Sequence, residues 1–135
     1  MPVESDDELR EILSLDTIAV VGCSRTQRKA AHAIPRYMLD HDYEVIPVNP
    51  YADEIFGREA RDSLSDVSDD VDIVDVFRPR DEVPDIVDEA LERDDAGVIW
   101  TQLGIRHEEA TRRAEQGGKC VVEDRCLKVE HQRLM

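Results

Sequence analysis

Five short runs of apolar, mostly β-branched residues recur along the chain, and the segments between them have helical spacing. The runs cover residues 17–21, 44–49, 71–77, 97–101 and 119–123. Most of them lack the polar alternation of a strand with one solvated face, so we expect strands that are buried on both faces. Strands that alternate with helices predict an α/β fold, a three-layer, doubly wound sandwich around a five-stranded parallel sheet of Rossmann-like type.

Helical patterns precede and separate the predicted strands. The capping-box sequence Ser-Asp-Asp-Glu begins an N-terminal helix, which we place within residues 1–15. Residues 16–134 then form the Rossmann-like core, and the length predicts a single domain over residues 1–135. The remaining helices are predicted over residues 30–40, 81–93 and 107–116, with a short helix around 61–67 and a last helical turn after 125.

Four residues disturb these patterns. Pro47 lies inside the second apolar run and indicates an edge strand or a bulge. Pro35 lies inside the predicted helix 30–40 and indicates a kink or a late helix start. Asp72 and Asp75 interrupt the third run, which makes its assignment as a buried strand weaker than the others.

The charge excludes several classes of partner. The formal net charge is −15, from 32 acidic and 17 basic residues, which argues against binding to nucleic acids or anionic membranes. The hydrophobic fraction of 41% argues against a disordered acidic chain. No run approaches the length of a membrane span, and the acidic N-terminus does not resemble a signal peptide, so we expect a cytoplasmic protein.

The scarcity of lysine adds to the charge argument. Only three of the 17 basic residues are lysines: Lys29, Lys119 and Lys128. A dense acidic surface that is poor in lysine is typical of proteins from high-salt cytoplasms, where carboxylates keep the surface hydrated and salt screens their repulsion. The sequence therefore favours a halophilic protein, and an ordinary acidic protein is the alternative.

The three cysteines do not suggest a disulfide framework or a zinc site. Cys23, Cys120 and Cys126 are odd in number and have no Cys-x-x-Cys spacing. We expect buried or incidental thiols and no metal site. Cys23 is the exception to examine, because a thiol at a helix N-terminus beside arginines is biased toward thiolate.

In a parallel α/β sheet, ligands bind outside the carboxyl ends of the strands, which directs attention to four turns. In the first, Gly22 allows a tight turn and Ser24 offers a hydroxyl group, next to the amides of the following helix. Helix N-termini prefer acidic residues, so the cations Arg25, Arg28 and Lys29 there indicate an anionic ligand. The glycines of a dinucleotide fingerprint and the Gly-Lys-Ser/Thr of a P-loop are both absent.

The other three turns supply further candidate contacts. Asn49 could bond a ribose or a base, and Pro50 with Tyr51 could form an apolar wall. The third strand ends in Phe77-Arg78-Pro79-Arg80, so five cations are predicted to face one crevice: Arg25, Arg28, Lys29, Arg78 and Arg80. The fourth turn, residues 100–105, closes the far side with the only tryptophan and a glutamine amide.

Five sequence blocks in a fixed order resemble one known family. The blocks are Val-Val-Gly-Cys-Ser, Ile-Pro-Val-Asn-Pro, Val-Asp-Val-Phe-Arg, Trp-Thr-Gln-Leu-Gly-Ile and Asp-Arg-Cys. Over residues 16–134 the chain resembles the small coenzyme A (CoA)-binding proteins, which are similar to the CoA-binding domain of the succinyl-CoA synthetase alpha subunit. The resemblance implies a Rossmann-like CoA-binding domain that stands alone.

The resemblance also implies a set of cofactor-binding residues. The first turn corresponds to the phosphate-binding turn of the family, and the second turn corresponds to the family's second contact with the ligand. The end of the third strand corresponds to a contact along the ligand. The fourth block corresponds to the residues that close the pocket. Cys23 replaces the usual alanine, and Tyr51-Ala52 occupies a stretch where relatives often have lysine. The predicted residues are Gly22, Cys23, Ser24, Arg25, Arg28, Val48, Asn49, Pro50, Tyr51, Val76, Phe77, Arg78, Gln102 and Gly104.

No catalytic residue is assigned. None of the four histidines has an evident partner by spacing, and the phosphorylated-histidine domain of the synthetase has no counterpart here. We predict that the protein binds CoA or an acyl-CoA, as a carrier or a CoA-responsive regulatory module rather than an enzyme. A non-catalytic subunit of a CoA ligase or transferase, and a binder of NAD or another adenine nucleotide, remain as alternatives. A homodimer or an unidentified protein partner also remains open.

Overall fold

The computed structural model describes residues 1–135 and is built on a five-stranded parallel sheet in the order β2-β1-β5-β6-β7. The predicted fold class is therefore confirmed. Each predicted run contains one strand, and four of the strands are shorter than their runs. The strands are β1 (Thr17–Val21), β2 (Glu44–Val48), β5 (Ile73–Val76), β6 (Val98–Thr101) and β7 (Cys120–Val122).

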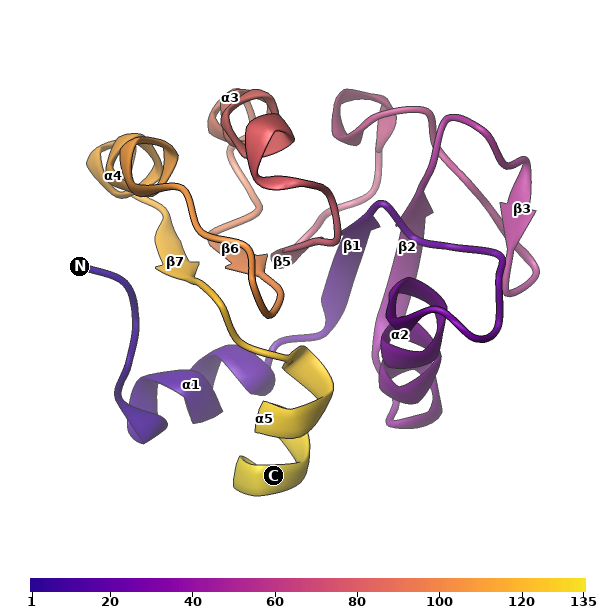
Figure 1. Cartoon of the computed structure of the whole chain (residues 1–135), viewed down its shortest axis with the longest axis horizontal. Coiled ribbons are helices and arrows are strands. Elements are labelled where there is room, and N and C mark those ends of the chain that lie inside the picture. Colours follow the sequence, from indigo (N-terminus) through magenta and orange to yellow (C-terminus); the bar gives the residue numbers. More distant parts are fainter.

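Helices cover both faces of the sheet (Figure 1). Side chains alternate between the faces along each strand, so Ile18 and Val20 pack on one side of β1, and Ala19 and Val21 on the other. None of the helices is long and apolar enough to cross a membrane. The first face carries α1 (Asp6–Leu13), α2 (Ala30–Asp40) and α5 (Leu127–Leu134), and the second carries α3 (Val83–Leu91) and α4 (Glu108–Gln116).

The first and last helices, α1 and α5, pack together on the first face of the sheet. The Ser5 hydroxyl accepts a hydrogen bond from the Glu8 N–H group, so the predicted capping box begins α1. The single helical turn predicted after residue 125 is a full helix, α5, in which Leu127 and Glu130 are buried. Arg133 of α5 forms ion pairs with Glu130 and with Asp6 of α1, which joins the two terminal helices.

The connection between β2 and β5 differs from the prediction. The short helix expected around residues 61–67 is only a 3₁₀ turn over Leu64–Asp66. A small hairpin that the sequence pattern did not predict precedes it, formed by β3 (Glu54–Ile55) and β4 (Arg58–Glu59). Phe56 and Gly57 both have positive φ, at 59° and 73°, as a tight two-residue hairpin turn requires.

Pro47 lies on an edge strand, as predicted. β2 pairs with β1 on one side only, so the missing N–H group of Pro47 leaves no gap inside the sheet. The Pro47 carbonyl oxygen accepts a hydrogen bond from the Arg61 N–H group at 3.0 Å. The segment after the hairpin thus covers part of this edge.

Candidate functional site

A cleft of about 370 Å³ opens at the carboxyl ends of β1 and β2, beside α3. The turns after these two strands, which we predicted to share a ligand site, both contribute to its wall. Eight of the predicted cofactor-binding residues line the cleft: Gly22, Cys23, Ser24, Val48, Asn49, Pro50, Tyr51 and Arg78.

The other six predicted residues lie outside the cleft lining. Arg25 and Arg28 are exposed in the same turn as Gly22. Val76 is fully buried in the core against the second face, and Phe77 packs on the first face. Gln102 and Gly104 follow β6, where the Gly104 N–H group donates to the Asp124 carboxylate.

Gly22 is required by the geometry of the first turn. Its φ of +92° is a conformation that side chains rarely adopt, and its N–H group donates to the Val48 carbonyl oxygen at 2.9 Å. A β-carbon at this position would lie 2.7 Å from the Cδ atom of Arg78. The absence of a side chain therefore lets the Arg78 stem cross directly over the turn.

The helix after this turn leaves backbone donors free. Pro35 has no N–H group to offer the Ala31 carbonyl oxygen, which accepts a hydrogen bond from the Ser24 N–H group at 3.0 Å instead. The late helix start predicted from Pro35 is wrong, because α2 begins at Ala30. Pro35 instead frees the Ala31 carbonyl oxygen, which fixes the turn. No acceptor meets the N–H groups of Ala30 and Ala31, and no side chain caps α2, so its N-terminus can receive an anion.

Asn49 joins the two turns. Its Nδ2 atom donates to the Cys23 carbonyl oxygen at 2.9 Å, and its Oδ1 atom accepts from the Tyr51 N–H group at 2.8 Å. We predicted that this amide could bond a ribose or a base, and in the structure each of its ends makes one hydrogen bond within the protein. Its position at the cleft wall is thus explained by holding the turns after β1 and β2 in register.

The charges of the cleft are divided between its two sides. Lys29 lines the side of the first turn, where Arg25 and Arg28 also lie without ion-pair partners. The α3 side is acidic. There Glu82 binds Arg78 at 2.6 Å and raises the pKa of that guanidinium. The acidic residues of the lining are Asp62, Glu82, Asp85 and Glu89.

The prediction that five cations converge on one crevice is therefore wrong in part. Only Lys29 and Arg78 line the cleft. Arg80 lies in a separate hollow with Arg106 and Arg112. The reason is that residues 80–82 form a 3₁₀ turn leading into α3, which separates Arg80 from Arg78.

Cys23 is not an activated thiol. It is fully buried, and burial together with the nearby Asp75 carboxyl raises its pKa to about 12. The thiolate bias predicted from its place before a helix is thus wrong, because desolvation outweighs the hydrogen bond that the Ser24 N–H group offers the sulfur. The buried thiol predicted as the simpler interpretation is confirmed for Cys23 and Cys126, whereas Cys120 is exposed.

Asp75 is the polar residue of this region that sequence reasoning missed. It lies on the central strand β5 and is fully buried, and its Oδ1 atom accepts a hydrogen bond from Gln102 Nε2 at 2.7 Å. Burial raises its pKa to about 7. The signal was present in the sequence, since an acidic residue inside an otherwise apolar central strand needs a polar partner.

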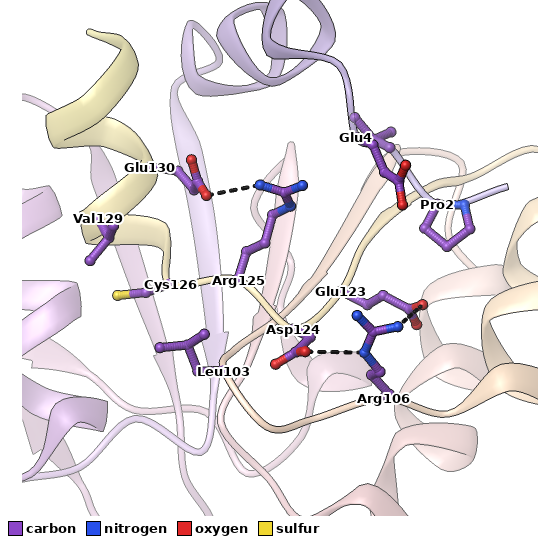
Figure 2. Close-up of a pocket in the computed structure, with 11 residues that line it drawn as sticks. Pro2, Glu4, Leu103, Arg106, Glu123, Asp124, Arg125, Cys126, Val129 and Glu130 are labelled. Atoms are coloured by element: carbon purple, nitrogen blue, oxygen red, sulfur yellow. Dashed lines mark hydrogen bonds and ion pairs between the residues drawn. The ribbon is translucent and has the colours of Figure 1, made fainter.

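A second hollow, of about 260 Å³, lies at the carboxyl ends of β6 and β7 beside α5 (Figure 2). Its cations already have acidic partners: Arg106 bonds Asp124 at 3.1 Å, and Arg125 bonds Glu130 at 3.0 Å. Leu103 and Val129 are exposed at its rim. Because its positive charge is neutralised, this hollow is less suited to a polyanion than the first turn.

Three of the four histidines are hydrogen-bonded within the protein. His107 caps α4 by accepting a hydrogen bond from the Ala110 N–H group, and His131 bonds the Tyr37 hydroxyl. No group of three or more His, Cys, Asp or Glu side chains that could hold a metal ion is found.

Comparison with known proteins assigns the chain to a family. Residues 16–132 match the model of the CoA binding domain family, so the chain belongs to that family. The chain is 41% identical over 128 residues to protein YneT of Bacillus subtilis, and the match covers 94% of each protein.

Solved structures show the same architecture. A Thermus thermophilus protein described as cell-free ID.343 is 45% identical, with a TM-score of 0.92, and the match covers 98% of this chain and 100% of that one. A hypothetical protein from Pyrococcus horikoshii is 34% identical, with a TM-score of 0.93, covering 99% of this chain and 96% of that one.

The chain is also similar to part of a much larger enzyme. The chain is 33% identical over 100 residues to the ADP-forming acetate–CoA ligase of Methanocaldococcus jannaschii. That match covers 74% of this chain but only 14% of the ligase. The likeness therefore concerns one part of that enzyme.

Proposed function

We propose that this protein binds CoA or an acyl-CoA in the cleft between the turns after β1 and β2, as a carrier or a CoA-responsive module without catalysis of its own. The observation that supports this most is the first turn. Gly22 there brings the backbone close to the cleft, and the uncapped N-terminus of α2 offers free amides beside Lys29. This is the arrangement that phosphate groups favour.

The division of charge suggests how the ligand is oriented. The phosphates bind at the first turn, where Arg25, Arg28 and Lys29 are not engaged by carboxylates. The adenine packs near Asn49 and Pro50, where the acidic residues of the α3 side can accept hydrogen bonds from its amino group or from ribose hydroxyls. The pantetheine arm extends past Phe77 and Arg78 toward Gln102.

The acidic surface fits a protein of a concentrated-salt cytoplasm. With a net charge of −15, the folded chain repels itself and repels a polyanionic ligand at long range. Concentrated salt shortens the range of that repulsion to a few ångström, so the local cations and amides of the first turn can act on the ligand. Backbone amides and packing then contribute more to binding than exposed arginines do.

A panel of ligands tests the proposal. We expect CoA and acetyl-CoA at about 100 times Kd to raise Tm by about 10 °C, from the mass-action gain of about 2.7 kcal/mol. NAD and ATP, measured in the same molar KCl buffer, serve as controls. Stabilisation by NAD or ATP with no response to either CoA species would overturn the proposal in favour of another nucleotide.

The likeness to part of the acetate–CoA ligases supports one second candidate. The protein could act as the CoA-binding subunit of an enzyme whose other subunits perform the chemistry, as the name of those ligases suggests. Acyl transfer that appears only when a co-purified partner is added would favour this role. CoA binding with no partner and no transfer would favour the carrier or regulatory role.

A further inference from the structure

The carboxyl group of Asp75 is an unusual feature of the sheet. Asp75 pairs in register with Val20 of β1 and Trp100 of β6, and its side chain is fully buried. Its Oδ2 atom is the only buried side-chain oxygen or nitrogen in the protein that has no hydrogen-bond partner. A buried, unpartnered oxygen is costly, so its presence at the carboxyl end of the sheet needs a reason.

Two groups from the neighbouring turns face Asp75. One is the Cys23 thiol, from the turn after β1, and the other is the Gln102 amide, which follows β6. Asp75 takes part in no ion pair, so no cation fixes it in the charged state. Burial raises the pKa of Asp75 to about 7 and that of Cys23 to about 12. Of these two groups, only Asp75 therefore changes charge near neutral pH.

The protonation of Asp75 determines which end of the Gln102 amide it can hold. An ionised carboxylate only accepts hydrogen bonds, so it holds Nε2 inward at 2.7 Å and leaves Oε1 outward. That Oε1 atom has no partner within the protein and is not among the buried unsatisfied atoms. A protonated carboxyl can donate, and a buried donor seldom stays unpaired, so it favours the reversed amide with Oε1 inward and Nε2 outward.

We infer that Asp75 is a positioning residue whose protonation decides whether Gln102 presents an acceptor or a donor to the sulfur end of bound CoA. The inference rests on the proposed function, in which the pantetheine arm reaches Gln102. The thiol of free CoA donates a hydrogen bond, so it is matched by the outward Oε1. The thioester carbonyl of an acyl-CoA accepts one, so it is matched by the outward Nε2. Ionised Asp75 therefore favours CoA, and protonated Asp75 favours acyl-CoA.

The test compares the two ligands across pH. The ratio of the Kd values of acetyl-CoA and CoA is measured by calorimetry between about pH 5.5 and 8, below the ionisation of the CoA thiol. The ratio cancels the titration of the phosphates, because both ligands carry the same phosphates. We expect the preference to shift toward CoA by about fivefold as pH rises through 7, the equivalent of one net hydrogen bond.

Two variants make the test specific. In Asp75→Asn the side chain can donate and accept at every pH, so both ligands still bind and the Kd ratio no longer depends on pH. Asp94→Asn removes an exposed carboxylate at the opposite end of the sheet and keeps the wild-type profile. Should Asp75→Asn fail to fold, Gln102→Met removes the amide instead, and its ratio is also flat.

The outcomes separate the inference from the proposed function. A wild-type ratio that does not change with pH, with both ligands bound, overturns the role of Asp75 alone. A slope that persists in Asp75→Asn or in Gln102→Met also overturns it. If the wild-type protein binds neither ligand, the proposed function fails and the inference fails with it.

Discussion

At the scale of single residues, the candidate site depends on residues that position the backbone of neighbouring turns. Gly22 permits a close crossing, and Asn49 ties the two turns together. The sequence identified both positions, but it did not show that Asn49 bonds the backbone of both turns, because composition and spacing do not reveal which hydrogen bonds the protein itself makes. Asp75 was noted only as an interruption, since its meaning comes from burial and from a partner 27 residues away.

A substitution at Gly22 tests the close crossing. Gly22→Ala forces a side chain into positive φ and places Cβ 2.7 Å from Arg78 Cδ, so we expect a loss of about 2 kcal/mol of stability and weaker CoA binding. Gly118→Ala is the matched control, because Gly118 has a φ of +90° but open space around it. Both variants are compared by chemical denaturation and by CoA titration. Equal losses of stability and of CoA affinity in the two variants would contradict the account.

The pH dependence of stability tests the burial of Asp75. The pKa of this carboxyl is raised from 3.8 to about 7, so the folded protein retains a proton that the unfolded chain has released. Its contribution to stability is therefore lost as pH rises from about 4 to about 7, on the order of 4 kcal/mol in total. We expect Asp75→Asn to gain stability relative to wild type over this range, and a difference that is constant with pH would contradict the account.

At the scale of elements, apolar runs and helical spacing predicted the strands and the main helices, because both depend on burial against the sheet. The hairpin over residues 54–59 was missed because its strands have two residues each and depend on a turn conformation. The helix α5 was underestimated because most of its residues are polar and its packing depends on α1 and α2. Short elements of this kind are determined by tertiary contacts.

The helix α2 offers a test at this scale. Pro35→Ala restores an N–H group that competes for the Ala31 carbonyl oxygen, so the Ser24 N–H group loses its acceptor. We expect faster hydrogen exchange at Ser24 and a CoA Kd raised by about fivefold, the equivalent of one net hydrogen bond. Pro84→Ala, at the start of α3, is the control, because an N–H group there has no helical acceptor. Unchanged exchange at Ser24 would show that Pro35 does not fix the turn.

At the scale of the whole molecule, the net charge of −15 is distributed unevenly. All thirteen ion pairs between side chains engage arginines outside the first turn, ten arginines in total, while Arg25 and Arg28 have no acidic partner. The sequence predicted this local excess of cations from their spacing. It did not predict the acidic α3 wall opposite, because that wall depends on how α3 packs beside β1 and β2.

The acidic surface predicts a dependence of stability on salt. We expect Tm to rise between 0.1 and 1 M KCl, where the screening length falls from about 10 to about 3 Å. The rise should nearly vanish at pH 4.5, close to the isoelectric point of the sequence, since the net charge is then near zero. A Tm that is independent of KCl at pH 7 would contradict the interpretation of the charge.

The central claim is that the first turn binds the phosphates of CoA, and calorimetric titration of CoA in molar KCl tests it most directly. We predict one CoA per chain, with a Kd raised at least about tenfold, or 1.4 kcal/mol, in the double variant Arg25→Glu with Arg28→Glu at unchanged Tm. The variant Arg80→Glu with Arg112→Glu reverses two other unpaired arginines, in a separate hollow, and should bind like wild type. Equal weakening by both double variants would contradict the placement of the phosphates, and no heat of CoA binding to the wild-type protein would contradict the claim itself.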